Sequence, residues 1–469
     1  MACRWAARST TWMTAPFRRR SRRAGRSEGT PAPMARLLLL TAGTEGDVRP
    51  FVNLAARLVA RGHEVGLAAP AGDAEMVAES GAQHLKLAID FRDMARQGQT
   101  HGAGLPGLID RLGRTHTLTG AGTLTRVADA LFETTARGRS FRPDAIIAHP
   151  KYTGAADLAQ TLQVPWAQVA LLPCIAPTAV VPNAALFARD MGPWANRASY
   201  CLTPLLARPL AGRTDRWRAE SLGLPPRRKA PPPAARLVLN AFSAALLPRI
   251  DDWGPEVATT GFWRAEDDAA ADAGLPIEAA AFATRATARR RPLIHIGFGS
   301  MSGVDGNGVA RSLARAIERA DVAALVTTGW GGIAGRALDR LAGDRVLVLD
   351  RMPHARVFPH VDLVVHHGGV GTLASGLMAG RAAVICPWGA DQPFWAARAV
   401  EGGYGLKGPG LRQLAAGGLG TGDRLGRTIR RALRHGPLTD TARRIGRRLR
   451  AEDGAHAAML AIEDMLRSR

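Results

Sequence analysis

Two stretches of the chain alternate short apolar runs with helix-like patterns. In the first stretch, the run RLLLL after Ala35 is followed by the loop TAGTEGDVRP, and then apolar residues recur every three or four positions from Phe51 to Val59. Gly62 ends this pattern, and residues 65–69 form another apolar run. A strand, a short glycine-containing loop, a helix and a parallel strand make a βαβ unit.

The same order of elements continues along the chain and begins again near residue 291. Strand-like runs follow at 144–149, 166–172, 235–242, 291–301, 323–329, 345–350, 362–369 and 382–388. We therefore predict an α/β protein with two Rossmann-like, doubly wound parallel-sheet domains. The predicted division is 1–33, a disordered basic extension; 34–250, the N-terminal domain; 251–290, a linker; 291–450, the C-terminal domain; and 451–469, a helix packing back on the N-terminal domain.

Charge changes this picture little once its position is considered. The 469 residues carry a net charge of +22, with 58 arginines and only four lysines. Residues 1–33 contribute +7 and residues 424–450 contribute +9, which leaves +6 for the rest. The excess charge therefore lies at two ends of the chain rather than over one binding face, and a GC-rich coding bias is an alternative explanation for it. A nucleic-acid binder is not expected, because only 5% of residues are aromatic and no mixed aromatic and basic motif occurs.

The two ends of the chain and its cysteines indicate where in the cell the protein is expected. Residues 1–33 lack the apolar core of a secretory signal, so we interpret them as a disordered tail or an over-extended start, with a transit-like segment as the alternative. The four cysteines show no metal-binding or CxxC spacing, which is typical of a reduced cytoplasmic protein. TARRIGRRLR, near the C-terminus, predicts a basic helical face that contacts an anionic membrane surface peripherally.

Residues 158–188 contain no charged side chain. Prolines 165, 173, 177 and 182 interrupt this segment, so it cannot form a continuous membrane-spanning helix. We predict a buried strand followed by an apolar loop. An apolar ligand is one reason for such a loop.

The segment VVHHGGVGTLASGLMAG, residues 364–380, carries the clearest chemical signal. It predicts a buried strand, then a glycine loop, then a helix that begins at Thr372. Small residues and the N–H groups of a helix N-terminus together suit a diphosphate. The alternative is that the glycines only make a tight turn. GFGSM at 297–301 repeats the pattern.

The pair His366 and His367 could also indicate a metal. Neighbouring residues on a strand point to opposite faces, and no His or Cys lies four positions on, so we expect no metal site. His367 is expected to donate to a phosphate or to pack under the loop.

Asp47 follows the first strand in a glycine loop. A carboxylate there could accept a proton from a hydroxyl, because parallel sheets bind ligands at the carboxyl ends of their strands. The alternative is that Asp47 caps the following helix. AGTEGD lacks the GxGxxG pattern of a Rossmann oxidoreductase.

Several motifs together resemble one enzyme group. They are TAGTEGDVRPFVNLAARLVARGHEV, AHPKYTGAADLAQTLQVP, GFGSM, MPHARVFPHVDLVVHHGGVGTLASGLMAG and WGADQPFWAARAVEGGYG. The chain resembles the GT-B nucleotide-sugar glycosyltransferases of family 1, in the sterol 3-beta-glucosyltransferase-like group, which is related to the glycopeptide and macrolide antibiotic glycosyltransferases. The resemblance implies two domains that face a central cleft.

The resemblance also implies roles for residues. Asp47 would be the catalytic base, and Asp391 and Gln392 would bind the sugar hydroxyls. Other donor contacts would come from Gly43, Thr44, Gly299, Ser300, Met352, His354, His367, Gly368, Gly369, Gly371 and Thr372. The segment from Arg351 to His354 would cradle the base.

The implied activity is an inverting, metal-independent transfer of a hexose, expected to be glucose from UDP-glucose, to a hydroxyl of an apolar acceptor such as a sterol, polyketide or lipid. The nucleotide sugar is a co-substrate, so no cofactor is expected. PHARVF and GRAA depart from the usual family motifs, and Ser375 replaces an acidic ribose contact. The choice between UDP and dTDP, and between glucose and another hexose, therefore stays open. The alternative is a non-catalytic GT-B-fold partner of another glycosyltransferase.

Overall fold

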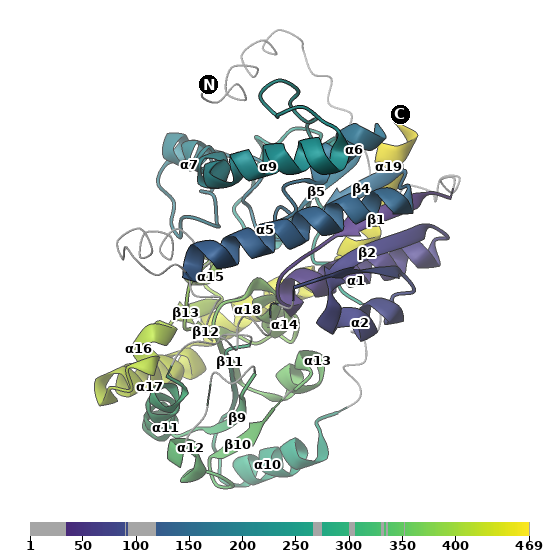
Figure 1. Cartoon of the computed structure of the whole chain (residues 1–469). Helices are drawn as coiled ribbons and strands as arrows, with labels where there is room; N and C mark the ends of the chain where they lie inside the picture. The colour runs from purple at the N-terminus through teal and green to yellow at the C-terminus, as the bar shows by residue number, and fades with distance from the viewer. Residues whose placement is uncertain are drawn as a thin grey trace.

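The computed structural model of the protein describes residues 34–89, 91, 119–265, 274–299, 305–329, 333, 336–350 and 352–468. Two α/β domains lie one above the other in Figure 1, each built on a parallel sheet. The predicted extension at 1–33 lies outside the described residues.

The first sheet has the strand order β3-β2-β1-β4-β5-β6-β7. Its strands are β1 (Arg36–Leu40), β2 (Glu64–Pro70), β3 (Gln83–Leu87), β4 (Ala145–Ala148), β5 (Trp166–Ala170), β6 (Leu237–Asn240) and β7 (Val257–Thr259). The helices of this part are α1 (Glu45–Ala60), α2 (Ala74–Glu79), α5 (Thr119–Arg137), α6 (Ala155–Leu162), α7 (Pro193–Ser199), α8 (Leu202–Ala207) and α9 (Ala211–Trp217).

Alternate residues of β1 enter two different cores, as the period of a strand requires. Leu37 and Leu39 pack with α1, and Leu38 and Leu40 pack with α5 and α6. Both faces of the sheet are therefore covered at its centre, which is why β1 and β4 are almost entirely apolar, whereas the edge strand β3 carries polar residues.

The second sheet has the order β10-β9-β8-β11-β12-β13. Its strands are β8 (Leu293–Gly297), β9 (Ala323–Thr327), β10 (Val346–Leu349), β11 (Leu363–His366), β12 (Ala383–Ile385) and β13 (Gly405–Lys407). Its helices are α10 (Ile277–Ala288), α11 (Gly306–Ala320), α12 (Arg336–Asp339), α13 (His354–Val357), α14 (Val370–Met378), α15 (Gln392–Glu401), α16 (Leu411–Ala415), α17 (Leu419–Arg434) and α18 (Gly436–Arg450).

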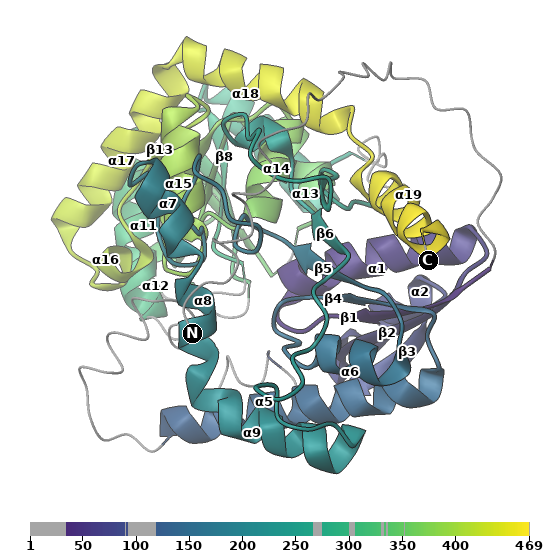
Figure 2. The same cartoon turned by 90° about the horizontal axis from the view of Figure 1, so that it is seen from above.

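A final helix, α19 (Gly454–Arg467), leaves the second domain and lies along α1 of the first (Figure 2). Its buried residues include Met459 and Ile462, which join the core between α1 and the sheet. Glu463 of α19 pairs with His63, and the His63 ring also accepts the backbone N–H of Ala35. Residues from the two ends of the described chain thus complete one core.

The predicted linker, 251–290, is too wide. It contains β7, which pairs with β6 at the edge of the first sheet, and α10, whose Phe282 lies in the core of the second domain. With only three residues, β7 is too short to show a strand period in the sequence. Two helices also begin earlier than predicted, α1 at Glu45 and α14 at Val370.

The apolar loop after β5 packs largely against the second domain. Val181 and Ala184 are buried in the same core as Trp395 of α15. This contact between domains explains part of the charge-free segment without any ligand.

The basic segment 424–450 forms the outer faces of α17 and α18. Leu425, Ile429 and Ile445 turn inward, whereas Arg427 and Arg447 are exposed. Among the described helices, none combines the length and the hydropathy that crossing a bilayer requires.

Candidate active site

Each sheet reverses its winding direction once, between β1 and β4 in the first and between β8 and β11 in the second. Open parallel sheets bind ligands outside the carboxyl ends of the strands at such points. In both domains, some of the residues predicted from the sequence follow these strands. Asp47 comes after β1, Gly299 after β8, and the HHGGVGT segment at the end of β11.

Asp47 is the third residue of α1. Its Oδ2 accepts the backbone N–H of Thr44, the residue that caps the helix, at 2.9 Å. A carboxylate in the first turn is also stabilised by the helix dipole. The capping role that the sequence left open is therefore real, and it occupies one oxygen of the carboxylate.

The other oxygen faces two residues of the loop after β4. Lys151 Nζ lies 2.9 Å from Asp47 Oδ1, and His149 Nε2 lies 3.5 Å from it. Because His149 Nδ1 accepts the backbone N–H of Lys151, the imidazole proton is on Nε2 and points toward Asp47. Burial lowers the pKa of His149 to about 3, so the ring is neutral near pH 7.

These partners decide the charge of Asp47. Burial alone would raise its pKa, but the charge of Lys151, together with the neighbouring His149 and the hydrogen bonds from Lys151 and Thr44, brings the pKa below the ordinary value. Asp47 is therefore a carboxylate near pH 7.

Gly43 makes room for this arrangement. Its φ is +143°, which favours glycine, and a Cβ there would overlap the Asp47 carboxylate and lie 2.5 Å from Lys151 Nζ. Gly43 and Thr44 thus surround Asp47, and their predicted contact with the donor phosphates stays a prediction.

In the second domain, β11 ends at His366 and Gly369 caps α14. Gly368 has a φ of +102°, and its N–H donates to His366 Nδ1 at 3.1 Å. A Cβ on Gly371, in the first turn, would meet no described atom within 4 Å. No described residue therefore covers this side of the N-terminus of α14, and its first N–H groups have no partner within the helix. Thr372, the third helical residue, is half-buried beside it.

The His367 ring lies between two predicted glycines. Ideal Cβ atoms on Gly299 and Gly369 would stand 3.1 and 2.5 Å from ring atoms of His367. Its Nδ1 is buried and has no hydrogen-bond partner among the described residues. Burial lowers the pKa of His367 to about 4, so the neutral ring carries one N–H that can donate to a phosphate oxygen.

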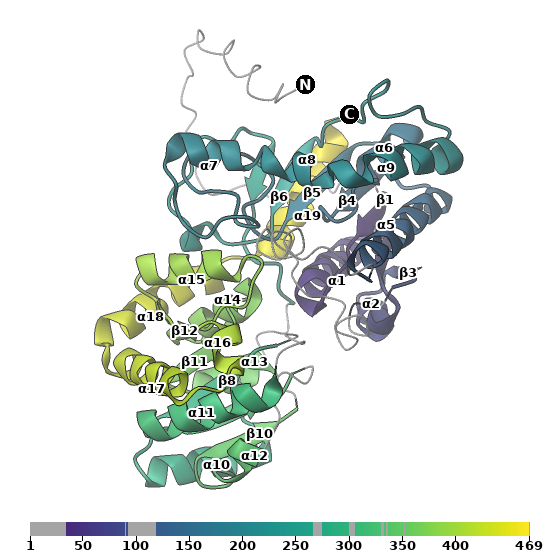
Figure 3. The same cartoon turned by 60° about the vertical axis from the view of Figure 1, so that its left-hand side comes forward.

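Asp391 and Gln392 stand at the start of α15, at the edge of the second domain that is turned to the first (Figure 3). Trp395 Nε1 donates to Asp391 Oδ2 at 2.9 Å, and Gln392 Oε1 accepts the N–H of Trp388 at 2.8 Å. Burial raises the pKa of Asp391 to about 6; the Asp47 charge raises it too, and Lys151 lowers it. The two switch points are thus close enough for their charges to interact.

The other predicted donor residues lie in different surroundings. Met352 is buried in the core beneath the second sheet. His354 stacks on Phe358, with ring centroids 4.4 Å apart. Burial lowers the pKa of His354 to about 4; on α1, the charge of Glu45 raises this pKa and that of Arg49 lowers it. Ser300 and Arg351 lie outside the described residues.

Sequence reasoning missed His149 and Lys151. Both directly follow a predicted parallel strand, so the rule that ligands bind at strand carboxyl ends could have placed them beside Asp47.

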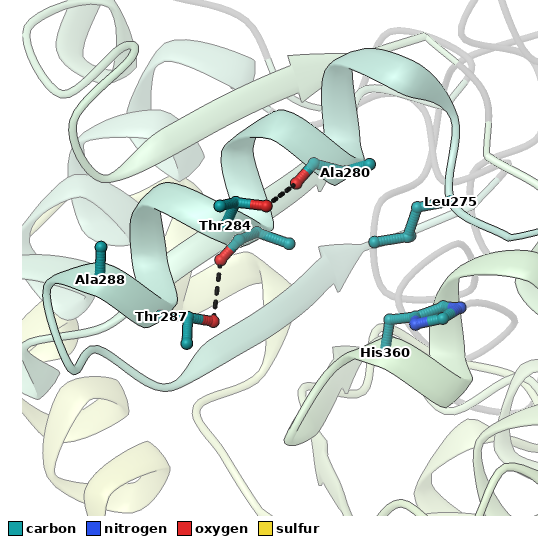
Figure 4. A pocket seen from close by; sticks show the side chains of 7 residues that line it. Leu275, Ala280, Thr284, Thr287, Ala288 and His360 are labelled. Carbon is teal, nitrogen blue, oxygen red and sulfur yellow. Dashed lines mark hydrogen bonds between the residues drawn. The ribbon is translucent and has the colours of Figure 1, made fainter.

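A separate hollow of about 670 Å³ lies on the outer side of α10 (Figure 4). Its lining residues are Leu275, Ala280, Ala283, Thr284, Thr287, Ala288 and His360. The hydroxyls of Thr284 and Thr287 donate to backbone carbonyls of their own helix. No predicted site residue borders this hollow.

The two opposed parallel-sheet domains have the GT-B fold of glycosyltransferases. Solved structures support this: the kitacinnamycin glycosyltransferase superimposes with a TM-score of 0.65 at 19% identity, covering 92% of this chain and 99% of that one. The calicheamicin glycosyltransferase CalG4 gives 0.59 at 16% identity, with 92% and 98% covered.

Sequence comparison identifies the relatives. Residues 37–169 match the glycosyltransferase family 28 N-terminal domain. The chain is 26% identical to the sterol 3-beta-glucosyltransferase of Yarrowia lipolytica, over 92% of its own length and 29% of the yeast protein. It is 30% identical to the sterol 3-beta-glucosyltransferase of Arabidopsis thaliana, over 80% of its length and 58% of the plant protein. The chain is thus a homologue of sterol glucosyltransferases, as its motifs predict, and spans only part of their length.

Proposed function

We propose that this chain is an inverting glycosyltransferase. It transfers a hexose, glucose from UDP-glucose, to a hydroxyl of an apolar acceptor such as a sterol, polyketide or lipid. The observation that carries the proposal is the pairing of an ionised Asp47 at one switch point with an open helix N-terminus at the other, with Asp391 coupled to both Asp47 and Lys151.

The proposed reaction is a single displacement. The acceptor hydroxyl gives its proton to Asp47, and its oxygen forms a bond to the anomeric carbon from the side opposite the diphosphate. The bond from that carbon to the diphosphate oxygen breaks, and the oxygen keeps the electron pair. Attack from the opposite side inverts the anomeric configuration.

The N-terminus of α14 and the His367 N–H would receive the departing diphosphate. Donors fixed in advance stabilise negative charge that develops in the transition state. Nδ1 of His367 has no hydrogen-bond partner among the described residues, which supports this role, because a buried polar atom without a hydrogen bond is costly unless a ligand supplies one. Asp391 and Gln392 would hold the sugar hydroxyls at the same edge.

An apolar acceptor is supported by the loop after β5. Cys174 in this loop is half-buried, and burial together with the charge of Asp391 raises the pKa of its thiol to about 12. The charge-free loop therefore runs beside Asp391. Cytoplasmic location and contact with an anionic membrane through the TARRIGRRLR segment of α18 stay predictions.

The test is the Asp47→Asn variant. We expect kcat to fall by about 10²- to 10⁴-fold with donor affinity nearly unchanged, because the amide cannot take the proton. Asp251→Asn changes an exposed aspartate of the same domain and should keep the parent rate.

Rates are measured with UDP- and dTDP-sugars against sterols, polyketides and polar sugars. An unchanged rate in Asp47→Asn would refute the base role, and transfer only to polar sugars would refute the apolar acceptor.

A further inference from the structure

One ammonium group stands in the candidate active site. Lys151 is among only four lysines in a chain with 58 arginines, and its side chain is 42% exposed. Its Nζ lies against Gly43 as well as Asp47. A compact ammonium on a flexible stem suits this confined position better than the planar fork of arginine.

The Asp47 carboxylate already has donors on both oxygens. Oδ2 receives the Thr44 backbone N–H, and Oδ1 faces Lys151 and His149. Each carboxylate oxygen has two lone pairs, and Lys151 and His149 face those of Oδ1, so an acceptor hydroxyl that gives its proton to Oδ1 takes the place of one of these two donors. His149 is buried, so the half-exposed Lys151 is the donor that can move away.

The titratable groups around Asp47 come from three elements. Lys151 and the neutral His149 belong to the loop after β4, and Asp391 belongs to the loop before α15. On α1 itself, Glu45 and Arg49 pair with each other and act on His354. Among the described residues, Lys151 is therefore the permanently charged cation that acts on both aspartates of the site.

We propose that Lys151 is a positioning residue for the transfer reaction. Its ammonium holds Asp47 as an oriented carboxylate while the site is empty and releases Oδ1 to the acceptor hydroxyl when the substrates bind. The ammonium neither gains nor loses a proton. The hydroxyl proton passes to Asp47, and the positive charge of Lys151 then remains beside Asp391 and the departing diphosphate. This inference rests on the proposed role of Asp47.

The test variant is Lys151→Met, which removes the charge and keeps the length of the side chain. Because Lys151 lowers the pKa of Asp47, its loss should raise that pKa and move the acid limb of kcat/KM to higher pH by about 1–2 units. Lys151→Arg should move the limb part of the way back. Lys86→Met, at an exposed position of β3, is the control and should leave the limb in place.

A second measurement does not need activity. The Asp47 carboxyl is followed by carbon-13 NMR in the full chain, with its signal assigned by its loss in Asp47→Asn. We expect its titration to move upward in Lys151→Met and to stay in place in Lys86→Met. Circular dichroism checks folding, and Lys151→Gln replaces Lys151→Met if the latter unfolds.

The outcomes separate the two proposals. A shifted Asp47 titration without transfer to any acceptor supports the electrostatic role of Lys151 and refutes the proposed function. Transfer activity with an unmoved titration and an unmoved acid limb in the Lys151 variants refutes the role of Lys151.

Discussion

At the scale of the single residue, the two oxygens of the Asp47 carboxylate lie in different surroundings. One oxygen completes the N-terminus of α1, and the other faces Lys151 and His149. Gly43 permits both, because its backbone passes where any side chain would displace the carboxylate. The geometry of the site therefore depends on a residue that has no functional group.

Gly43→Ala tests this dependence. We expect the backbone strain to cost about 1–3 kcal/mol, and the displaced Asp47 to lower kcat by about 10²-fold. Gly62→Ala is the matched control, since Gly62 has a φ of +101° and a Cβ there would meet nothing within 4 Å. That variant should lose stability and keep its rate. Denaturation curves and steady-state rates measure both, and equal rates in the two variants would contradict the steric role of Gly43.

The sequence is informative about residues that act through local spacing. Asp47 and the glycines near His367 were predicted because a strand, a loop and a helix are contiguous in the chain. Lys151 was missed because it lies more than a hundred residues from Asp47, and an ion pair between distant segments leaves no periodic pattern. The orientation of His354 toward α1 also depends on how the two domains approach each other.

Among the elements, α6 and the turn that directly follows α9 (Arg218–Leu222) are joined by a buried ion pair. Asp157 of α6 pairs with Arg218 and Arg227, and the side chains of Asp157 and Arg218 are fully buried. Arg218 also donates to the carbonyls of Pro225 and Ala230. The proline-rich segment is thereby attached to the first domain by charge and hydrogen bonds rather than by apolar packing alone.

Asp157→Ala should destabilise the protein by about 3–5 kcal/mol, because it leaves Arg218 buried without its carboxylate. Asp129→Ala removes the partner of Arg213 in α9, where both side chains are well exposed, and should cost less than about 1 kcal/mol. Urea denaturation compares the two variants with the parent. Similar losses in both would show that burial does not set the strength of the Asp157 pair.

Strands that lie in a continuous apolar run were predicted well, and some strands outside such runs were not. The apolar runs of β1, β4, β8 and β11 are long enough to be recognised, because both faces of each sheet are buried. By contrast, β7 and β13 have three residues each and depend on pairing with a neighbouring strand. The first turn of α1 was assigned to the loop, because its glycine and acidic residues resemble a turn in the sequence.

At the scale of the whole molecule, α19 links the second domain back to the first. This helix follows the second domain in the chain but packs in the core of the first. Hydrogen bonds add to this packing: Ser243 donates to Glu452 just before α19, and Arg264 donates to the carbonyl of Glu452. The two domains are thus connected twice, once after β7 and once between α18 and α19.

Ile462→Ala should lower the free energy of unfolding by about 2–5 kcal/mol, because Ile462 is fully buried against α1 and the first sheet. Leu460→Ala, on the same helix but 38% exposed, should change it by about 0.5 kcal/mol or less. Thermal and urea denaturation measure the difference. Equal losses would mean that α19 does not contribute to the core.

The position of α19 also affects the order in which the chain can fold during translation. The ribosome completes β7 at Thr259 and reaches Gly454 only after it has made the entire second domain. At about 5–20 residues per second, this delay lasts roughly 10–40 seconds. During that time the apolar residues of α1 that pack against α19 lack their partner helix, so the core of the first domain is completed only after the second domain has been made.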